Sequence, residues 1–246
     1  MCRLLAYAST EPATLATIVG PTLTDFVELS KEHKHGWGVT TCASIGGVQE
    51  RERDLAPAVE SSLFAEVASS KPTDGALVHL RLASKGLAID LSNNHPFIHG
   101  DISFMHNGTI RPASSIDHLV DADLMAQLTS STDSERYFFA ILSAAKKVGL
   151  IEAIAATVKE IVSTSDYSAI NSITLTPDFL IAVCQFNVAE QSEWTVPFHY
   201  ELRFAKEDGA IKVASTGWGH DDWTPLTNGK ILVVNRADLS YKILDI

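Results

Sequence analysis

The chain begins Met-Cys-Arg-Leu-Leu-Ala-Tyr-Ala, residues 1–8, and places a thiol directly before an apolar run. The run from Cys2 to Ala8 predicts a short buried strand. If the initiator methionine is removed, Cys2 carries a free α-amine. Because an α-amine has a pKa of about 7.7–8.0, part of it is unprotonated near neutral pH and can accept the thiol proton. One residue then supplies nucleophile and general base; the alternative is a thiol that only packs.

The rest of the chain predicts helices clustered between groups of strands. Such clustering favours a layered α+β domain over a doubly wound parallel sheet. No linker or internal repeat divides the 246 residues, so we expect one domain over residues 1–246. Gly46-Gly47 predicts a hairpin turn, and Thr10 with Pro12 predicts a helix start. Strands are expected at 39–43, 48–53, 76–82, 102–106, 173–175, 179–186, 200–204, 211–214, 231–234 and 241–244, and further helices at 22–34, 57–69, 134–148 and 151–162.

The composition excludes several classes of protein. The chain has 19 Lys+Arg against 30 Asp+Glu, and its net charge of −11 argues against binding nucleic acid or an anionic membrane surface. The longest strongly apolar stretch, Phe179 to Cys184, is too short to span a bilayer, and the N-terminus has no signal peptide. Cys2, Cys42 and Cys184 are too scattered for a disulfide framework, so we expect a cytoplasmic protein with reduced thiols. Cys42 and Cys184 lie in apolar strands and are expected to be inert.

Three further positions carry polar chemistry at the ends of elements. Arg81 closes an apolar strand, where its planar guanidinium suits a carboxylate, or it is a solvent-exposed arginine at a strand edge. Asn107-Gly108 ends another strand, and a side-chain amide beside a glycine N–H can form an oxyanion hole, although Asn-Gly is also a common turn. Thr132 and Asp133 precede a helix: one of the two caps it, and Asp133 is also placed to receive an ammonium group.

In combination, five segments resemble the class II glutamine amidotransferases, which use an N-terminal nucleophile. The beginning of the chain resembles a small stand-alone branch of that class, which includes the γ-glutamyl amidase of ergothioneine biosynthesis. The resemblance implies the four-layer αββα sandwich of N-terminal-nucleophile hydrolases. The segments are Met-Cys-Arg-Leu-Leu-Ala-Tyr (1–7), His-Leu-Arg-Leu-Ala-Ser (79–84), Asn-Asn-His-Pro-Phe (93–97), Met-His-Asn-Gly (105–108) and Thr-Asp-Ser-Glu (132–135).

The resemblance implies a role for each matching residue. Cys2 would attack the γ-carbonyl of a γ-glutamyl group, with its own α-amine as base. Asn107 and the Gly108 N–H would hold the oxyanion. Arg81 would bind the α-carboxylate and Asp133 the α-ammonium group of the glutamyl moiety.

Two other segments bear on the pocket. His-Gly-Trp-Gly (35–38) resembles the loop that covers glutamine, so Trp37 would bind substrate; equally, Trp37 would lie in the core where a strand begins. Residues 214–219 read Ala-Ser-Thr-Gly-Trp-Gly, where relatives of this branch usually have a Ser-Glu-Pro-Leu-like segment, and this departure concerns the leaving-group end of the pocket. His-Asp-Asp (220–222) lacks a fourth ligand at suitable spacing, so no metal site is expected.

The implied reaction is hydrolysis of the γ-glutamyl amide of glutamine or a γ-glutamyl compound through a γ-glutamyl thioester, which requires no metal or organic cofactor. The chain has room for the glutamine-handling domain alone, so a synthase that receives ammonia is expected to be a separate chain. The alternatives are action on a larger γ-glutamyl compound without a partner, or a non-catalytic γ-glutamyl-binding module. A hydrolase that pairs Cys42 with a histidine lacks any local signature. Homo-oligomerisation stays open.

The catalytic interpretation predicts that Met1 is absent from the mature protein, because the α-amine of Cys2 must be free. The intact mass of the purified protein is then lower than that of the full sequence by one methionine residue. Retention of Met1 would instead favour the non-catalytic binding module.

Overall fold

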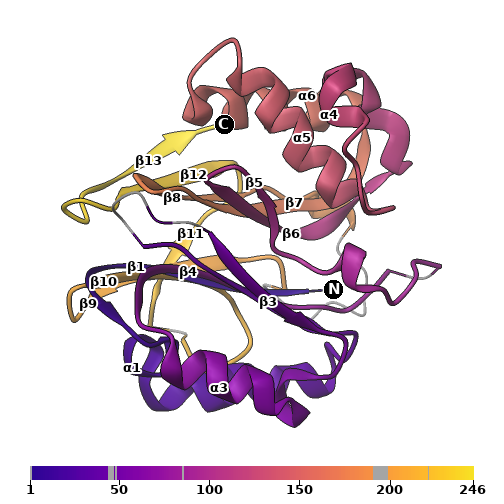
Figure 1. Cartoon of the computed structure of the whole chain (residues 1–246). Coiled ribbons are helices and arrows are strands. Elements are labelled where there is room, and N and C mark those ends of the chain that lie inside the picture. Colours follow the sequence, from indigo (N-terminus) through magenta and orange to yellow (C-terminus); the bar gives the residue numbers. More distant parts are fainter. Residues whose placement is uncertain (1, 44–46, 48, 85, 191–198, 221) are drawn as a thin grey trace.

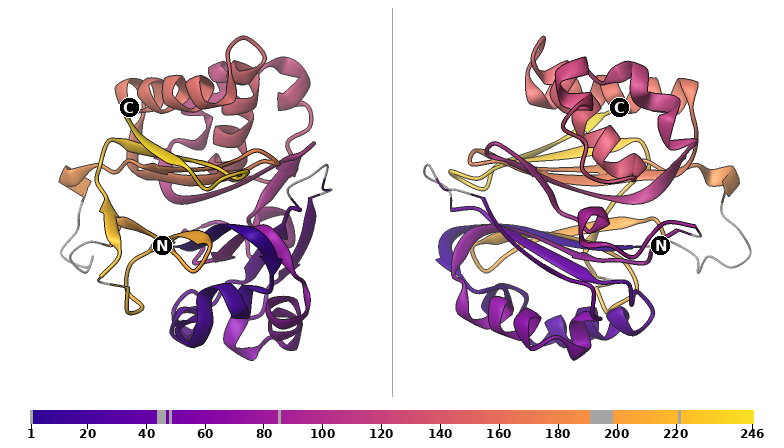
Figure 2. Two further views of the ribbon diagram at one scale, coloured as in Figure 1. Left: turned by 90° about the vertical axis from the view of Figure 1, so that its left-hand side faces the viewer. Right: turned by 45° about the vertical axis from the view of Figure 1, so that its right-hand side comes forward.

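Cys2 directly precedes β1 (Arg3–Ala13), which lies inside a sheet between β4 and β10. The computed structural model describes the whole chain except residues 1, 44–46, 48, 85, 191–198 and 221. Two antiparallel sheets pack face to face, and helices cover the outer face of each (Figures 1 and 2). The four-layer αββα order implied by the resemblance is therefore confirmed.

The first sheet contains β1, the strand that follows Cys2. Its order is β11-β9-β10-β1-β4-β2-β3, and β1 pairs antiparallel with both β4 and β10. Two ladders therefore fix the position of the chain just after Cys2. The other strands of this sheet are β2 (Trp37–Thr41), β3 (Glu50–Asp54), β4 (Thr73–Leu80), β9 (Leu202–Glu207), β10 (Ala210–Ser215) and β11 (Thr224–Leu226).

The second sheet has the order β13-β12-β8-β7-β6-β5. Its strand β6 contains Asn107 and Gly108, and the register of β6 against β7 shifts between Gly108 and Ile110. This shift lies where the strand reaches the candidate site. The strands are β5 (Phe97–His99), β6 (Ile102–Arg111), β7 (Asp166–Leu175), β8 (Phe179–Cys184), β12 (Lys230–Asn235) and β13 (Tyr241–Asp245).

Helices form the two outer layers, with α1, α2 and α3 on the first sheet and α5 and α6 on the second (Figure 1). No helix in the described ranges is long and apolar enough to cross a membrane. The α-helices are α1 (Leu15–Val19), α2 (Leu23–Glu28), α3 (Ser62–Ser70), α4 (Ala122–Met125), α5 (Asp133–Ala145) and α6 (Leu150–Thr164). The 3-10 helices are η1 (Gly20–Thr22), η2 (Leu29–Lys31), η3 (Ala58–Glu60), η4 (Leu91–Asn93), η5 (Ala113–Leu119) and η6 (Val188–Glu190).

The apolar run in β1 is continuous because both faces of this strand are buried. Leu4 and Ala6 pack between the two sheets, whereas Leu5 and Tyr7 pack under the helices of the outer layer. Side chains alternate between the two faces of a strand, so a strand covered on both sides needs apolar residues at every position. The predicted strand at the start of the chain is confirmed.

The expected helix start at Thr10 is wrong. Strand β1 continues through Ala13, and the Thr10 N–H donates to the carbonyl oxygen of Gly209 at 2.9 Å. Helix α1 begins at Leu15, and the side chain of the preceding residue, Thr14, accepts a hydrogen bond from the Thr17 N–H. Thr14 thus provides the N-cap that was expected of Thr10.

Most other expected elements are present, with shifted ends. Strands β2 and β3 pair antiparallel as the hairpin prediction requires, but Gly46 lies outside the described residues. Strand β7 begins at Asp166, well before the expected residue 173. Polar residues before Ile173, such as Asn171 and Ser172, conceal the strand pattern although both are buried. The short elements α4, β5 and β11 were not expected.

An ion pair ties the two sheets together. Arg236, just after β12, donates to the Asp74 carboxylate on β4 at 2.8 Å and to the Cys42 carbonyl oxygen at 2.7 Å. Both charged side chains are at least nine-tenths buried. Burial raises the pKa of the Cys42 thiol. Cys42 therefore has the character of a structural core thiol, as expected.

Candidate active site

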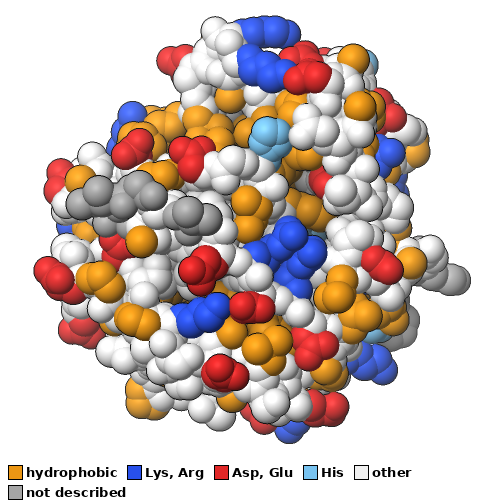
Figure 3. All heavy atoms as spheres, in the orientation of Figure 1, with side chains coloured by type: hydrophobic (Ala, Val, Ile, Leu, Met, Phe, Trp, Pro, Cys, Tyr) orange, Lys and Arg blue, Asp and Glu red, His pale blue; other side chains and the backbone are white. Residues whose placement is uncertain are grey.

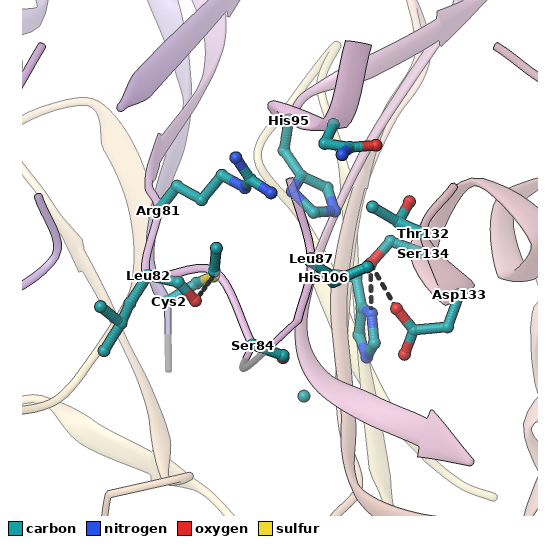
Figure 4. Close-up of a pocket in the computed structure, with 13 residues that line it drawn as sticks. Cys2, Arg81, Leu82, Ser84, Leu87, His95, His106, Thr132, Asp133 and Ser134 are labelled. Atoms are coloured by element: carbon teal, nitrogen blue, oxygen red, sulfur yellow. Dashed lines mark hydrogen bonds between the residues drawn. The ribbon is translucent and has the colours of Figure 1, made fainter. Parts of the chain in front are cut away.

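Cys2 opens onto a cavity of about 120 Å³ at the edge of the sheets (Figure 4). Arg3 pairs with Leu80 of β4, so Cys2 comes to lie beside the segment that follows β4. The Cys2 Sγ–H donates to the carbonyl oxygen of Leu82 at 3.8 Å, and the residue is half-buried. The cavity is lined by Cys2, Arg81, Leu82, Ala83, Ser84, Leu87, Asn93, His95, His106, Gly108, Thr132, Asp133 and Ser134.

Arg81 brings a buried positive charge to this cavity. Its guanidinium donates to the Asn94 Oδ1 atom at 3.1 Å and to the Ala88 carbonyl oxygen at 3.0 Å. Only 3% of the residue is exposed, and no described acidic side chain forms an ion pair with it. Burial lowers the pKa of Arg81, but a guanidinium remains charged at neutral pH. The cavity therefore presents a cation that forms no ion pair with the described acidic side chains.

A short backbone ladder holds Arg81 in place. Its N–H donates to the Gly36 carbonyl oxygen at 2.8 Å, and the His35 N–H donates to the Arg81 carbonyl oxygen at 3.0 Å. The His35 ring accepts from the Ala83 N–H at 2.9 Å. Gly36 has a φ of +111°, and a Cβ there would collide with the Asn94 side chain. The segment expected to cover substrate therefore positions the arginine instead.

Trp37 is not brought to the cavity. Its side chain is fully buried and contacts Phe64 edge-on, with ring centroids 5.1 Å apart. On strand β2, Trp37 and Val39 point to the same side, into the core beneath the helices. The structure thus shows the core alternative for Trp37 rather than a place beside the other site residues.

Asp133 lies on the wall opposite Arg81 and Cys2 (Figure 4). It is the first residue of α5, and Thr132 is the N-cap, accepting from the Glu135 N–H at 3.3 Å. The Asp133 Oδ2 atom accepts from the Ile110 N–H on β6 at 2.6 Å. The carboxylate is therefore fixed to the second sheet, and the capping role belongs to its neighbour.

Strand β6 contributes Gly108 to the cavity and places Asn107 beside it. Gly108 has a φ of +153°, and a Cβ there would collide with the Ala169 carbonyl. The Asn107 side chain is buried, and neither its Nδ2 nor its Oδ1 atom has a hydrogen-bond partner. A buried unpaired polar group costs about 1–3 kcal/mol. Asn107 does not line the cavity, whereas Cys2, Arg81, Gly108 and Asp133 all do.

Two histidines of the cavity wall were not assigned to the site by sequence reasoning. His106 lies between the Ala169 carbonyl oxygen, 3.2 Å from Nε2, and the Ser134 hydroxyl, 2.9 Å from Nδ1. Since the carbonyl can only accept, Nε2 carries the proton and Nδ1 accepts from Ser134. Sequence reasoning had one signal from which His106 could have been assigned to the site. His106 directly precedes Asn107 on β6, where side chains alternate between the two faces of the strand.

His95 is buried and has no hydrogen-bond partner at either ring nitrogen in the described structure. It packs on the His79 ring with centroids 4.3 Å apart. Burial lowers the pKa of His79 to about 3 and holds the pKa of His95 well below the usual range. Both rings are therefore neutral at pH 7 and add no charge beside Arg81.

The surroundings of Cys2 favour the neutral thiol at rest. Burial raises its pKa, while the Leu82 hydrogen bond and the positive charges of Arg81 and Arg3 act in the opposite direction. The hydrogen bond of the thiol goes to a backbone carbonyl, which cannot take its proton. Chemistry at this thiol therefore needs a base, and a freed α-amine on the same residue has the required reach.

Other features lie apart from this cavity. A depression of about 380 Å³ lies between β3 and β5, where Arg51 donates to the Pro96 carbonyl oxygen. On the face of the molecule that Figure 3 shows, basic side chains lie near the centre of the view, among apolar and acidic side chains. Within the described ranges, no three His, Cys, Asp or Glu side chains gather closely enough to hold a metal ion. His220 packs between two tryptophans, and Asp221 lies outside those ranges.

Comparison with known proteins identifies similar chains. The family model of the class II glutamine amidotransferases matches residues 1–243. A glutamine aminotransferase class-II domain protein from Silicibacter pomeroyi superposes with a TM-score of 0.70 at 19% identity, covering 100% of this chain and 99% of that one. A predicted glutamine amidotransferase from Pseudomonas aeruginosa gives a TM-score of 0.58 at 17% identity, with both chains fully covered.

A larger enzyme contains a similar fold. The glutamine phosphoribosylpyrophosphate amidotransferase of B. subtilis matches with a TM-score of 0.63 at 19% identity, covering 99% of this chain but 49% of that one. At such identities the structural likeness shows the fold alone. A search of curated protein sequences found no match.

The exposure of the three thiols predicts their order of reaction. Under native conditions iodoacetamide should modify half-buried Cys2 well before Cys42 and Cys184, which are 0% exposed. Because burial raises the pKa of Cys2, its rate should keep rising above pH 8.5, about the pKa of an ordinary thiol. Peptide mapping measures both effects, with denatured protein as the control. A plateau below pH 8.5 would show that the arginine charges outweigh burial.

Proposed function

This chain belongs to the class II glutamine amidotransferases, and from that membership we propose that it hydrolyses a γ-glutamyl amide through a γ-glutamyl thioester on Cys2. The observation that carries the proposal is the charge arrangement of one small cavity. Arg81 lies buried on one wall without an ion pair to any described acidic side chain, the Cys2 thiol opens on the same side, and Asp133 is fixed on the opposite wall. These groups match the carboxylate, ammonium and γ-carbonyl groups of a glutamyl moiety.

Substrate binding would neutralise the charges of the cavity. Arg81 keeps its geometry through Asn94 and Ala88, and its remaining N–H groups suit a substrate α-carboxylate. The free oxygen capacity of Asp133 suits the α-ammonium group. Because the two charges are held on different sheets, a glutamyl group that spans them is oriented with its side chain toward Cys2. Orientation of this kind lowers the barrier by removing the entropic cost of alignment.

The bond-making steps follow from the thiol and the strand end. The α-amine of Cys2 takes the thiol proton, and Sγ attacks the γ-carbonyl carbon to form a tetrahedral intermediate. Its oxyanion accepts from the Gly108 N–H and from Asn107 Nδ2, which has no partner in the described structure. The proton passes to the leaving amine as the C–N bond breaks. Water then attacks the thioester and releases glutamate and the thiol.

Two versions of this activity differ in the amine that leaves. In one, the chain hydrolyses glutamine and delivers ammonia to a separate synthase. In the other, it hydrolyses a larger γ-glutamyl compound without a partner. The similar amidotransferase of B. subtilis is about twice as long as the region that it shares with this chain. Glutamate release from a panel of both substrate kinds distinguishes the versions.

Site variants test the mechanism. Cys2→Ala should abolish glutamate release, and Asn107→Ala should lower kcat about 10²- to 10³-fold, because one oxyanion donor is lost. Asp133→Asn should chiefly raise KM, since it removes the charge that faces the ammonium group. Cys42→Ala is the matched control, because Cys42 lies in the core and does not line the cavity. The folded fraction of this variant should keep the normal kcat and KM. Full activity of folded Cys2→Ala would overturn the proposal.

A further inference from the structure

Ser134 lines the cavity and has no place in the mechanism above. It is the second residue of α5, and only 5% of it is exposed. Its Oγ atom lies 2.9 Å from His106 Nδ1 and 3.4 Å from Asp133 Oδ1, and Figure 4 draws both contacts as dashed lines. The hydroxyl is therefore held between a ring nitrogen and the carboxylate that faces the substrate ammonium group in the proposed mechanism.

His106 fixes the direction of the Ser134 hydroxyl proton. The Ala169 carbonyl oxygen, 3.2 Å from Nε2, can only accept, so the single proton of a neutral ring lies on Nε2. Burial lowers the pKa of His106, although the charge of Asp133 acts in the opposite direction, so the ring is neutral at pH 7. Nδ1 is then an acceptor for the Ser134 hydroxyl. The longer contact to Asp133 Oδ1 is the weaker competitor for the same proton.

The cavity side of the Ser134 oxygen is left with acceptor capacity alone. A hydroxyl has one donor position and two acceptor positions. Because the donor position is used by His106, any group that meets Ser134 from the cavity must bring its own proton. An ammonium group satisfies this requirement, whereas a carboxylate oxygen would face lone pairs.

The charges on this wall have the sign that a cation requires. The N-terminus of α5 carries about half a positive charge, but the carboxylates of Asp133 and Glu135 lie in its first turn and outweigh it. The neutral ring of His106 adds no charge. Arg81, the cation of the site, lies on the opposite wall (Figure 4). The wall formed by Asp133 and Ser134 therefore suits a cationic group with several N–H donors.

We propose that Ser134 is a specificity-determining residue that accepts a hydrogen bond from the α-ammonium group of the substrate, with its hydroxyl oriented by His106. The inference rests on the proposed function, because it adds a second acceptor at the ammonium end of the same glutamyl group. An ammonium group has three N–H donors, so it can bind Asp133 and Ser134 together. His106 is a positioning residue, since it acts by holding the hydroxyl proton away from the cavity.

A matched pair of substrates isolates the ammonium group. Glutamine and glutaramate differ only by this group, and glutaryl amides give the same pair for larger γ-glutamyl compounds. In Ser134→Ala, kcat/KM for glutamine should fall about ten- to a hundredfold, mostly through KM, which is the range of one hydrogen bond to a charged group. The value for glutaramate should stay near that of the wild type. Inhibition constants of glutamate and glutarate provide the same comparison from binding alone.

Two control variants accompany Ser134→Ala. Ser143→Ala removes another buried hydroxyl of α5, one that donates to the Phe139 carbonyl oxygen and does not line the cavity. It should keep the wild-type preference for glutamine over glutaramate. Ser134→Thr retains a hydroxyl at the site and should retain most of the preference.

His106→Phe tests the positioning role. Without the ring acceptor, the Ser134 proton can turn toward Asp133 or the cavity, so the preference for glutamine should fall as it does in Ser134→Ala. Combined with Ser134→Ala, this change should cause no further loss of preference, because both residues act through one hydrogen bond. A full additional loss in the double variant would contradict the positioning role.

A purely structural role for Ser134 gives a different result. If Ser134→Ala lowers kcat/KM equally for both substrates, Ser134 merely holds the start of α5 and the inference is overturned. Should Ser134→Ala fail to fold, Ser134→Cys replaces it, because a thiol is similar in size but is a weak acceptor. An unchanged preference in Ser134→Cys would likewise overturn the inference.

The same measurements distinguish this inference from the proposed function. If the protein releases glutamate in a Cys2-dependent manner and Ser134→Ala keeps the wild-type preference, only the role of Ser134 fails. If no γ-glutamyl amide is hydrolysed, the proposed function itself fails.

Discussion

The antiparallel pairing of β1 with β4 and β10 is the constraint on which the site depends. It fixes the backbone directly after Cys2 on both sides and brings the end of β4, with Arg81, next to the thiol. The burial of both faces of β1 makes this pairing strong, because apolar side chains pack against the second sheet and against the outer helices. The Cys2 thiol thereby gains a defined position.

The second sheet positions the groups that face Cys2 across the cavity. The register shift in β6 beyond Gly108 and the start of α5 at Asp133 meet where the Ile110 N–H binds the Asp133 carboxylate. Charge then organises the cavity. Buried arginines without acidic partners are costly for a folded protein, and a bound zwitterionic substrate offsets that cost. In the proposed mechanism the same interactions that relieve the unpaired charges also orient the γ-carbonyl toward the thiol.

Sequence reasoning predicted the layer order and the meeting of Cys2, Arg81, Gly108 and Asp133, because their segments carry recognisable residue patterns. It could not place Trp37, since a tryptophan between two glycines is compatible with a covering loop and with a core strand. Local composition was also ambiguous at Thr10, whose backbone N–H pairs with Gly209, almost 200 residues away.

The central claim is that Cys2 forms a covalent γ-glutamyl thioester. Rapid acid quenching during turnover of a γ-glutamyl substrate, followed by peptide mass mapping, detects that intermediate directly. The account predicts a γ-glutamyl adduct on an N-terminal Cys2 that lacks Met1, and the loss of this adduct when hydroxylamine cleaves the thioester. Turnover without any adduct on Cys2, or an adduct on Cys42 or Cys184, would contradict the account.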